Sequence, residues 1–409
     1  MTDPLVSEPD MSRVPQLESL DPSGKRVLVR VDYNVPIEGG RVVDPFRVEA
    51  SLPTLRYLLD RGASLVLMSH LGRPAGSGFE AEFSLAPVAK TLEERIGRPV
   101  ALAPDCVGSD VETLAGQLQP GQILLLENLR FHKKEKKGDP EFGAQLAKLG
   151  DLYVCDAFGT AHREDASMTR PQEHLPSAAG YLLAAELKYL GGIVEAPARP
   201  FVAILGGAKV SDKLPILEAL GPKCDTLAIG GAMAYTFLKA RGEEVGTSRV
   251  EADLVETAGK ILADLEGKGV NVLLPQDHLV ADSFDSDAAE SVTAIPAAKM
   301  GLDVGEQTRT AIGASIDSAK TVLFNGPLGV YERDAYQGGT RSVIESIGRA
   351  TAAGAVTVVG GGDAAAAVAA FGAQDRVTHV STGGGASLEL LSGATLPAIA
   401  SLEAAGQRG

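Results

Sequence analysis

The stretch RPFVAILGGAKVSDKLPILEAL, residues 199–220, decides the fold class of this chain. Its apolar run at 201–205 has the length of one buried strand, and Gly206-Gly207 interrupts that run. From Val210 onward, apolar residues recur three and four positions apart, which predicts a helix. A strand that leads through glycines into a helix is typical of a phosphate-binding turn, because backbone N–H groups and a helix N-terminus both favour an anion.

Two lysines strengthen this interpretation. Lys209 and Lys213 are four residues apart, so on a helix they point the same way. Two ammonium groups above a glycine turn suit a polyphosphate, although an ordinary turn with two solvated lysines would have the same sequence. The stretch has neither a G-x-x-x-x-G-K-[ST] nor a G-x-G-x-x-G motif, so it is not a P-loop and lacks the dinucleotide fingerprint.

The composition bounds the possible functions. A chain of 409 residues is long for one core, which favours two domains. The net charge of −15 argues against nucleic acid or an acidic membrane as a partner, so an anionic substrate would need a local basic cluster. The three cysteines share no C-x-x-C spacing, and we expect reduced core or loop residues. The first residues contain no apolar signal segment and no run of 18 apolar residues follows, so we expect a cytoplasmic protein without a membrane span.

Short apolar runs alternate with helical patterns along the whole chain. This alternation predicts an α/β fold with two Rossmann-like three-layer domains, each with a parallel sheet, joined by a helix and hinge. The expected strands are 26–31, 64–68, 100–103, 123–126, 152–155, 201–205, 226–229, 270–274, 321–324, 356–359 and 377–380. The expected helices include 48–60, 85–96, 235–240, 252–265 and 340–352.

The connection between the domains is expected at 178–193, AAGYLLAAELKYLGGI. The pattern predicts a helix that ends at Gly191-Gly192, and it fits a hinge element or a packed core helix equally well. We therefore expect an N-terminal domain at 1–178, a connecting helix at 179–192 and a C-terminal domain at 193–391.

Basic side chains follow the predicted strands of the first half. Arg47, Arg73, Arg130, Arg163 and His70 all come shortly after a strand or a turn. The carboxyl ends of parallel strands meet at one edge, so we expect these side chains to form a rim that binds a small anion. A surface ion pair is the commoner fate of one arginine, but four at successive strand ends favour a site. The mixed-charge run HKKEKK (132–137) is interpreted as a solvated turn without function.

Glycines follow the predicted strands of the second half. They occur as GG at 206–207, GG at 230–231, NGP at 325–327, GGGD at 360–363 and TGGG at 382–385. Exposed N–H groups there suit nucleotide phosphates. Asp363 could hold Mg²⁺ or act as a helix N-cap, and both roles are compatible.

An anion rim and a set of phosphate turns indicate a two-substrate enzyme that transfers a phosphoryl group. A carboxylate acceptor would need no general base, since it is ionised at neutral pH. Two alternatives stay open from the residues alone: a nicotinamide-dependent dehydrogenase on two Rossmann-like halves, and a non-catalytic two-lobed binding protein.

The motifs together resemble the phosphoglycerate kinase family, from about residue 14 to residue 396. The matching segments are RVDYNVP (30–36), SHLGRP (69–74), ENLRF (127–131), DAFGTAHR (156–163), GGAKVSDK (206–213), NGPLGVYE (325–332), GGGD (360–363) and STGGGASLE (381–389).

The resemblance implies a cytosolic monomer that interconverts 1,3-bisphosphoglycerate plus ADP with 3-phosphoglycerate plus ATP, using Mg²⁺ and hinge closure. It implies that the substrate is bound by Asp32, Tyr33, Asn34, Arg47, His70, Leu71, Gly72, Arg73, Arg130 and Arg163. It implies that the nucleotide is bound by Gly207, Ala208, Lys209, Lys213, Gly301, Asn325, Glu332, Gly361, Gly362, Asp363 and Ala364, with Asp363 at the metal. Arg47, Lys209 and Gly384 would be catalytic, and the tail 392–409 would pack back on the N-terminal domain.

The chain departs from the family pattern at three places. Glu164-Asp165 stands where the family usually has Ala-His, which adds negative charge beside a substrate arginine. Ala364 replaces the usual Thr or Ser, and Glu306 the usual Pro. We expect the first departure to change the affinity for the anion or its salt dependence.

Overall fold

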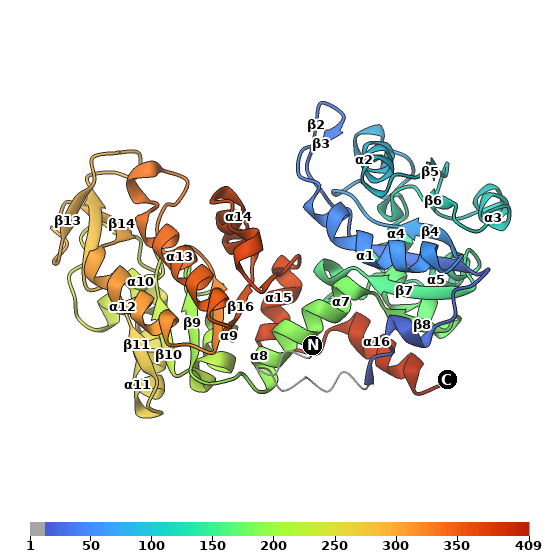
Figure 1. The fold of residues 1–409 in the computed structure, drawn as a ribbon. Helices are drawn as coiled ribbons and strands as arrows, with labels where there is room; N and C mark the ends of the chain where they lie inside the picture. Colours follow the sequence, from blue (N-terminus) through green and yellow to red (C-terminus); the bar gives the residue numbers. More distant parts are fainter. Residues whose placement is uncertain (1–12, 409) are drawn as a thin grey trace. The chain divides into compact units, whose positions relative to one another are not determined.

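The computed structural model describes residues 13–408, which form two units (Figure 1). The N-terminal unit contains the described residues up to Lys188 together with Thr395 to Arg408, and the C-terminal unit is Tyr189–Ala394. The chain thus passes between the units within the π-helical turn Leu187–Gly191 and again after Ala394. The predicted domain limits, and the roles given to those domains, stay a prediction.

The N-terminal unit is built on a parallel sheet of six strands in the order β5-β6-β4-β1-β7-β8. The strands are β1 (Arg26–Val31), β4 (Ser64–Met68), β5 (Val100–Leu102), β6 (Ile123–Leu125), β7 (Leu152–Asp156) and β8 (Ser177–Ala179), with a small hairpin of β2 (Ile37–Glu38) and β3 (Arg41–Val42). The helices are α1 (Phe46–Asp60), α2 (Ala86–Ile96), α3 (Ser109–Gly116), α4 (Lys133–Lys136), α5 (Pro140–Ala147), α6 (Ala166–Thr169), α7 (Tyr181–Glu186) and α16 (Pro397–Gly406).

Local sequence signals explain where several of these helices begin and end. The Asp139 side chain caps α5 by accepting the Phe142 N–H, and Pro140 occupies the first turn, where it costs no hydrogen bond. Gly97 ends α2 in the left-handed conformation. Apolar residues of α1 and α2, such as Leu55 and Leu92, then pack against one face of the sheet.

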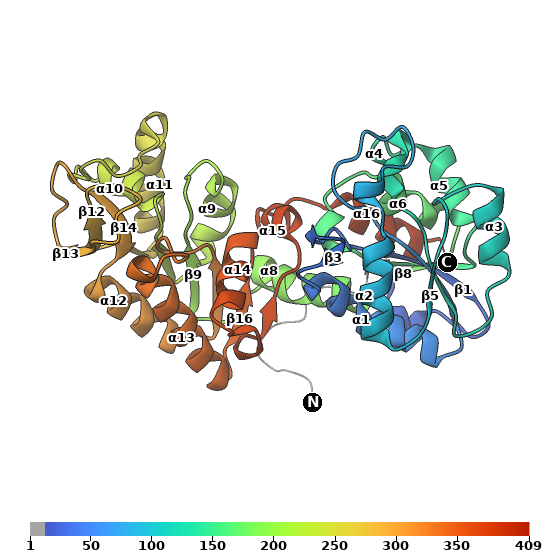
Figure 2. The same cartoon turned by 90° about the horizontal axis from the view of Figure 1, so that it is seen from above.

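The C-terminal unit has a second parallel sheet of six strands, in the order β11-β10-β9-β15-β16-β17. The strands are β9 (Phe201–Leu205), β10 (Thr226–Ile229), β11 (Asn271–Leu273), β15 (Thr321–Asn325), β16 (Val356–Val359) and β17 (His379–Val380). The helices are α8 (Gly192–Glu195), α9 (Leu214–Leu220), α10 (Ala234–Ala240), α11 (Val255–Gly267), α12 (Glu306–Asp317), α13 (Gly338–Ala352), α14 (Gly362–Ala370) and α15 (Gly384–Leu391). α12 and α13 lie side by side (Figure 2), and with α14 they bury one face of the sheet.

The predicted α/β class with two parallel sheets is confirmed, and each of the eleven predicted strands is present. Two features were not predicted. β8 adds a sixth strand to the first sheet, and a three-stranded antiparallel sheet of β12 (His278–Ala281), β13 (Glu290–Val292) and β14 (Met300–Val304) adds to the C-terminal unit.

Two helix predictions were wrong. The helix expected over 178–193 begins only at Tyr181, passes through the π-helical turn, and ends at Glu195 rather than at the glycine pair 191–192. The helix expected from Val210 begins at Leu214, because Pro215 belongs to a first helical turn and would break a longer helix.

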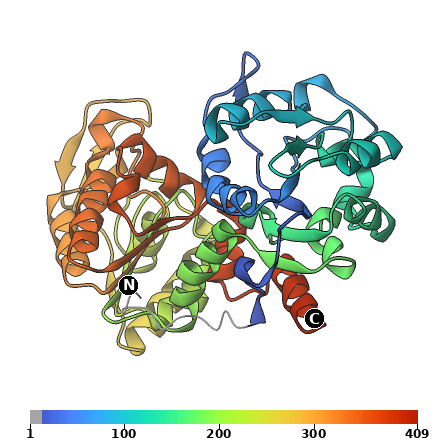
Figure 3. The same cartoon turned by 45° about the vertical axis from the view of Figure 1, so that its right-hand side comes forward.

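The last helix, α16, belongs to the N-terminal unit and contacts β8 and α6 (Figures 1 and 3). The Ala398 N–H donates to the Ala161 carbonyl at 3.1 Å, and the Arg408 guanidinium donates to the Gln172 carbonyl at 3.1 Å. Among residues 13–408, none of the helices is both long and apolar enough to cross a bilayer.

Candidate functional site

The first candidate site lies where β1, β4, β6 and β7 end, at one edge of the N-terminal sheet. Arg47, in the first turn of α1, donates to Asp32 Oδ2 at 3.0 Å and to the Asn34 carbonyl at 3.2 Å. The Asn34 side chain accepts the Gly72 N–H at 2.9 Å, and the Gly72 carbonyl accepts from Arg130 at 2.8 Å. These bonds join the ends of three strands into one surface, which we call the arginine cluster.

His70 lies in the middle of this cluster and is almost completely buried. Burial lowers its pKa well below 6.5, and Arg30, Arg130, Arg163 and Arg47 lower the pKa further. Arg30 Nη2 lies 3.2 Å from His70 Nδ1, and an arginine can only donate. The ring is therefore neutral, accepts at Nδ1 and carries its proton on Nε2.

Sequence reasoning missed the residues that support His70. Arg30 is fully buried, and its Nε donates to Ser167 Oγ at 2.8 Å. Ser167 in turn donates its hydroxyl and N–H to the Glu135 carboxylate, at 2.6 and 2.9 Å. The interpretation of 132–137 as a solvated turn was therefore wrong for Glu135, which has no exposed surface. An arginine within the apolar strand β1 was the available signal for this network.

Two predicted substrate residues face the core. The Tyr33 ring is fully buried, and its hydroxyl lies 2.8 Å from Ser51 Oγ. Leu71 is buried, and both its backbone N–H and its carbonyl bond to the Asn128 side chain. The side chains of these two residues pack in the core beside the arginine cluster and do not line it. Arg73 is exposed, and among the described residues no hydrogen bond or ion pair ties it to the cluster.

A carboxylate also lies in the arginine cluster. Asp165 is 4% exposed, and its Oδ2 lies 3.9 Å from Arg130 Nη2. That oxygen has no hydrogen-bond partner among the described residues, and neither has Arg130 Nε. Burial and the nearby Arg163 lower the pKa of Arg130, while Asp165 acts against that shift. Asp165 therefore balances part of the positive charge of the arginine cluster.

The second candidate site lies in the C-terminal unit and consists of two adjoining cavities. The glycine cavity, of about 440 Å³, is lined by Gly207, Ala208, Lys209, Asp212, Lys213, Gly326, Gly360, Gly361, Gly362, Asp363, Ala364, Gly384 and Leu388. The aromatic cavity, of about 470 Å³, shares Gly207, Ala208 and Asp363 with it and also contains Tyr235, Arg249, Phe284, Gly301, Tyr331 and Glu332. Each predicted nucleotide residue except Asn325 thus lines at least one of the two.

The sequence predicted that the two lysines share one face of a helix, and this was wrong. Both lysines precede α9. The Lys213 ammonium donates to the Asn325 side chain, and burial lowers its pKa against the opposing effect of Asp363 and Asp212. Asn325 is fully buried, and its Nδ2 has no partner among the described residues. Lys209 is exposed on the turn before the helix.

An internal carboxylate holds this turn. Glu251 accepts hydrogen bonds from the N–H groups of Val210 and Ser211, and from Ser211 Oγ at 2.7 Å. Burial raises the pKa of Glu251, but these hydrogen bonds outweigh burial and hold the pKa below 4.5. The Val210 and Ser211 amides are thus already occupied, so an anion at this turn must use the glycine end and the lysine side chains.

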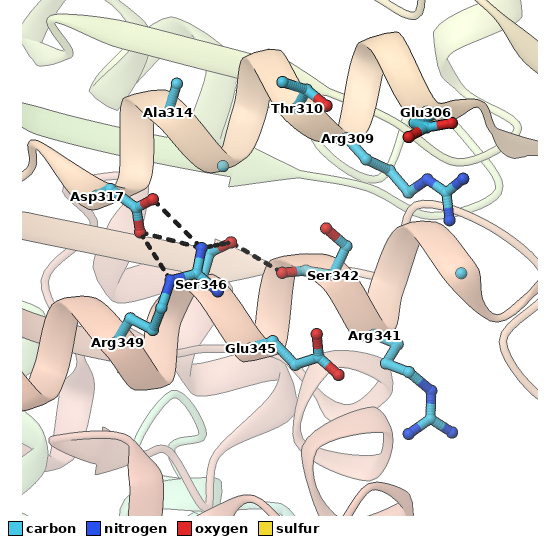
Figure 4. Close-up of a pocket in the computed structure, with 12 residues that line it drawn as sticks. Glu306, Arg309, Thr310, Ala314, Asp317, Arg341, Ser342, Glu345, Ser346 and Arg349 are labelled. Carbon is cyan, nitrogen blue, oxygen red and sulfur yellow. Dashed lines mark hydrogen bonds and ion pairs between the residues drawn. The ribbon is translucent and has the colours of Figure 1, made fainter.

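Two other groupings are explained without a ligand. The groove between α12 and α13, of about 710 Å³, is lined by charges of both signs, and Arg349 pairs with Asp317 across it (Figure 4). Asp105, Cys106 and His132 offer ligand atoms within 4.8 Å of one another. There, however, Asp105 accepts from the His132 ring at 2.7 Å, and burial raises the pKa of the Cys106 thiol.

Comparisons with known proteins agree with this geometry. The sequence profile described as phosphoglycerate kinase matches residues 17–394. The phosphoglycerate kinase of Chloroherpeton thalassium is 50% identical over 384 residues, which cover 93% of this chain and 96% of that protein. The enzyme of Moorella thermoacetica is 51% identical over 94% of this chain and 98% of its own length.

Solved structures show the same similarity. The structure of phosphoglycerate kinase from Coxiella burnetii has a TM-score of 0.86 and 37% identity, covering 95% of this chain and 98% of that chain. The enzyme from Pyrococcus horikoshii has a TM-score of 0.84 and 30% identity, covering 96% and 100%. None of these matches supports the dehydrogenase alternative. The chain belongs to the phosphoglycerate kinase family.

Proposed function

We propose that the arginine cluster binds 3-phosphoglycerate or 1,3-bisphosphoglycerate, and that the glycine and aromatic cavities bind ADP or ATP. As a member of its family the chain is a phosphotransferase with a carboxyl group as acceptor. The reaction moves a phosphoryl group reversibly between 1,3-bisphosphoglycerate and ADP, giving 3-phosphoglycerate and ATP.

The observation that carries the proposal is the convergence of Arg47, Arg130 and Arg163 on a neutral His70, in a protein of net charge −15. Guanidinium forks bind phosphate and carboxylate through two parallel hydrogen bonds. The His70 Nε2–H adds a neutral donor. This combination suits a phosphorylated carboxylic acid better than it suits a cation or an apolar ligand.

Catalysis then depends on position and charge rather than on a covalent nucleophile. The acceptor carboxylate is already ionised at neutral pH, so the reaction needs no general base. Arg47 and Lys209 would neutralise the charge that develops on the transferring phosphoryl group. The Gly384 N–H, at the start of α15 in the glycine cavity, would donate to the same oxygens.

The residues present fit a Mg²⁺ ion. Asp363 and Asp212 both line the glycine cavity, and neither forms an ion pair among the described residues. Carboxylate oxygens are the ligands that Mg²⁺ prefers, with phosphate oxygens and waters completing the shell. We propose that Asp363 holds the ion, which when bound would neutralise charge on the nucleotide phosphates.

Three further parts of the proposal extend the family assignment. The two units close by a hinge during turnover, which excludes water from the transferred group. The protein acts as a monomer. It acts in the cytoplasm, although a 48% identical relative is the chloroplastic enzyme of Volvox carteri.

A coupled assay tests the reaction directly. The purified chain is supplied with 1,3-bisphosphoglycerate, ADP and Mg²⁺, and ATP formation is followed. We expect turnover that stops when ADP is omitted and falls when EDTA removes the metal. Absence of ATP formation by protein with a normal thermal transition would refute the proposed function.

Lys209→Ala tests the nucleotide half of the site. We expect turnover to fall far more than stability, because Lys209 is exposed and carries little packing. Lys239→Ala, an exposed lysine on α10 that does not line either cavity, is the control. Loss of folding in Lys209→Ala would contradict the role given to this lysine.

A further inference from the structure

Glycine backbone and apolar side chains line much of the aromatic cavity. Backbone of Gly207, Gly231 and Gly301 contributes to its walls, and Leu302 and Leu328 are among its apolar side chains. A side chain at Gly301 would collide with the buried Tyr235 side chain, so these two residues of the lining pack closely against each other. Phe284 is exposed at 55% and also lines the cavity. This is the surface that a purine base fills under the proposed function, on which the following inference rests.

Arg249 is the cation that lines this cavity among the described residues. It is exposed, and no carboxylate of the described chain lies within ion-pair distance of it. Glu332 and Asp363 line the same cavity without pairing with it. Its guanidinium group therefore has donors to offer to a ligand.

The backbone on both sides of Arg249 is held in place. Thr247 donates its N–H to the Lys299 carbonyl at 2.8 Å, and Ser248 Oγ accepts the Gly301 N–H at 2.9 Å. On the other side, the Glu251 N–H donates to Thr236 Oγ1 at 3.1 Å. The Cα of Arg249 is thus anchored at the cavity while its long side chain can adjust to the ring that enters.

Guanine and hypoxanthine differ from adenine at the edge of the ring to which an arginine can donate hydrogen bonds. Guanine and hypoxanthine present two acceptors, O6 and N7, which match the parallel donors of a guanidinium group. Adenine presents the N7 acceptor beside the N6 amino group, which is a donor. Arginine has five N–H donors and no acceptor, so it can satisfy only one position on adenine.

We propose that Arg249 is a specificity-determining residue for the base, and that it shifts the preference of this enzyme from adenine nucleotides toward guanine and hypoxanthine nucleotides. Binding of a 6-oxopurine places O6 and N7 against the guanidinium group. Binding of adenine leaves that group without its second bond. The phosphates and the transferred group stay in the glycine cavity in either case.

The test compares kcat/KM for GTP, ITP and ATP in the direction that phosphorylates 3-phosphoglycerate, in the wild-type enzyme and in Arg249→Leu. We expect Arg249→Leu to lower the GTP-to-ATP ratio of kcat/KM about tenfold, the scale of one arginine–guanine pair. ITP should follow GTP, because it shares O6 and N7 and lacks the 2-amino group. Arg241→Leu, an exposed arginine that pairs with Glu266 outside the cavity, is the matched control and should leave the ratio unchanged.

One result would overturn the inference: the GTP-to-ATP ratio stays within about twofold of the wild-type value in Arg249→Leu. If both nucleotides then lose kcat/KM by the same factor, the arginine only stacks on the ring. Calorimetric titration of ADP and GDP into the same variants gives the ratio of the two affinities without turnover. A failure of the proposed function would show in the ATP reaction of the wild-type enzyme, whereas a failure of this inference would show only in the ratio.

Discussion

The buried carboxylate of Asp165 lies 3.9 Å from the guanidinium group of Arg130, within the proposed substrate site. Both side chains are more than nine-tenths buried, so little water screens the interaction. A phosphate or carboxylate arriving at Arg130 must share it with a charge that the protein already holds there. Asp165 belongs to the first of the departures from the family pattern, so we expect this competition to change the affinity of this chain for its anion.

Asp165→Asn removes that charge and keeps the size and backbone of the residue. We expect the dissociation constant for 3-phosphoglycerate to fall about three- to tenfold, because Arg130 regains its full attraction for the anion. Calorimetric titration of 3-phosphoglycerate measures the change, and a steeper dependence on salt should accompany it.

The neighbouring Glu164→Gln supplies the control, since it makes the same change of charge at an exposed position. Its affinity for 3-phosphoglycerate should stay within about twofold of the wild-type value. Weaker binding in Asp165→Asn would show that Asp165 holds Arg130 in place rather than competing for it.

Glu251 positions the turn that carries Lys209. Its carboxylate accepts three hydrogen bonds from Val210 and Ser211, and without it the N–H of the buried residue Val210 would lose this partner. We expect Glu251→Ala to raise the KM for ATP about tenfold and to leave the KM for 3-phosphoglycerate unchanged. Glu251→Gln, which keeps one acceptor oxygen, should recover part of the loss.

Glu256→Ala is the matched control, because Glu256 is an exposed residue of α11 that pairs only with Lys260 among the described residues. Steady-state kinetics with each substrate varied in turn separates the two KM values. Equal changes in both would mean that Glu251 supports the whole protein rather than this turn.

The strands could be predicted from the sequence, while much of the support behind the sites could not. Each strand of a parallel sheet is covered on both faces, so it appears as a short apolar run. β13 is largely exposed and gives no such run. Arg130 and Asp363 could be named as candidates because they lie shortly after the ends of β6 and β16. Glu135 and Glu251 could not be named. Each bonds to a partner far away in the chain, at a separation of 32 residues for Glu135 and 41 residues for Glu251, and only folding brings the partners together.

Arg47 is held ready by its bonds to Asp32 and the Asn34 carbonyl, so its position does not depend on a ligand. If it neutralises charge in the transition state, Arg47→Ala should lower kcat about 10³-fold, on the lower scale of arginine fingers. Arg56→Ala, an exposed arginine on the same helix, should change kcat less than twofold. A loss of less than about tenfold in Arg47→Ala would remove this residue from the transition state.

Asp156, at the end of β7, makes the stability of the folded protein depend on pH. It accepts the N–H groups of Leu182 and Leu183 at the start of α7, and burial raises its pKa from 3.8 to about 7. Between these two values the folded chain keeps a proton that the unfolded chain has lost, so this group's contribution to stability falls as pH rises toward about 7. Asp156→Asn stays neutral and still accepts both N–H groups, so it should be stabilised relative to wild type by on the order of 2 to 4 kcal/mol more at about pH 8 than at about pH 4. Thermal unfolding of both proteins across this range gives the difference.

Asp151→Asn serves as the opposite case. Hydrogen bonds with Arg26 lower the pKa of Asp151, so this variant should lose stability relative to wild type as pH rises. Parallel pH profiles for wild type and Asp156→Asn would show that this carboxyl titrates normally in the folded protein.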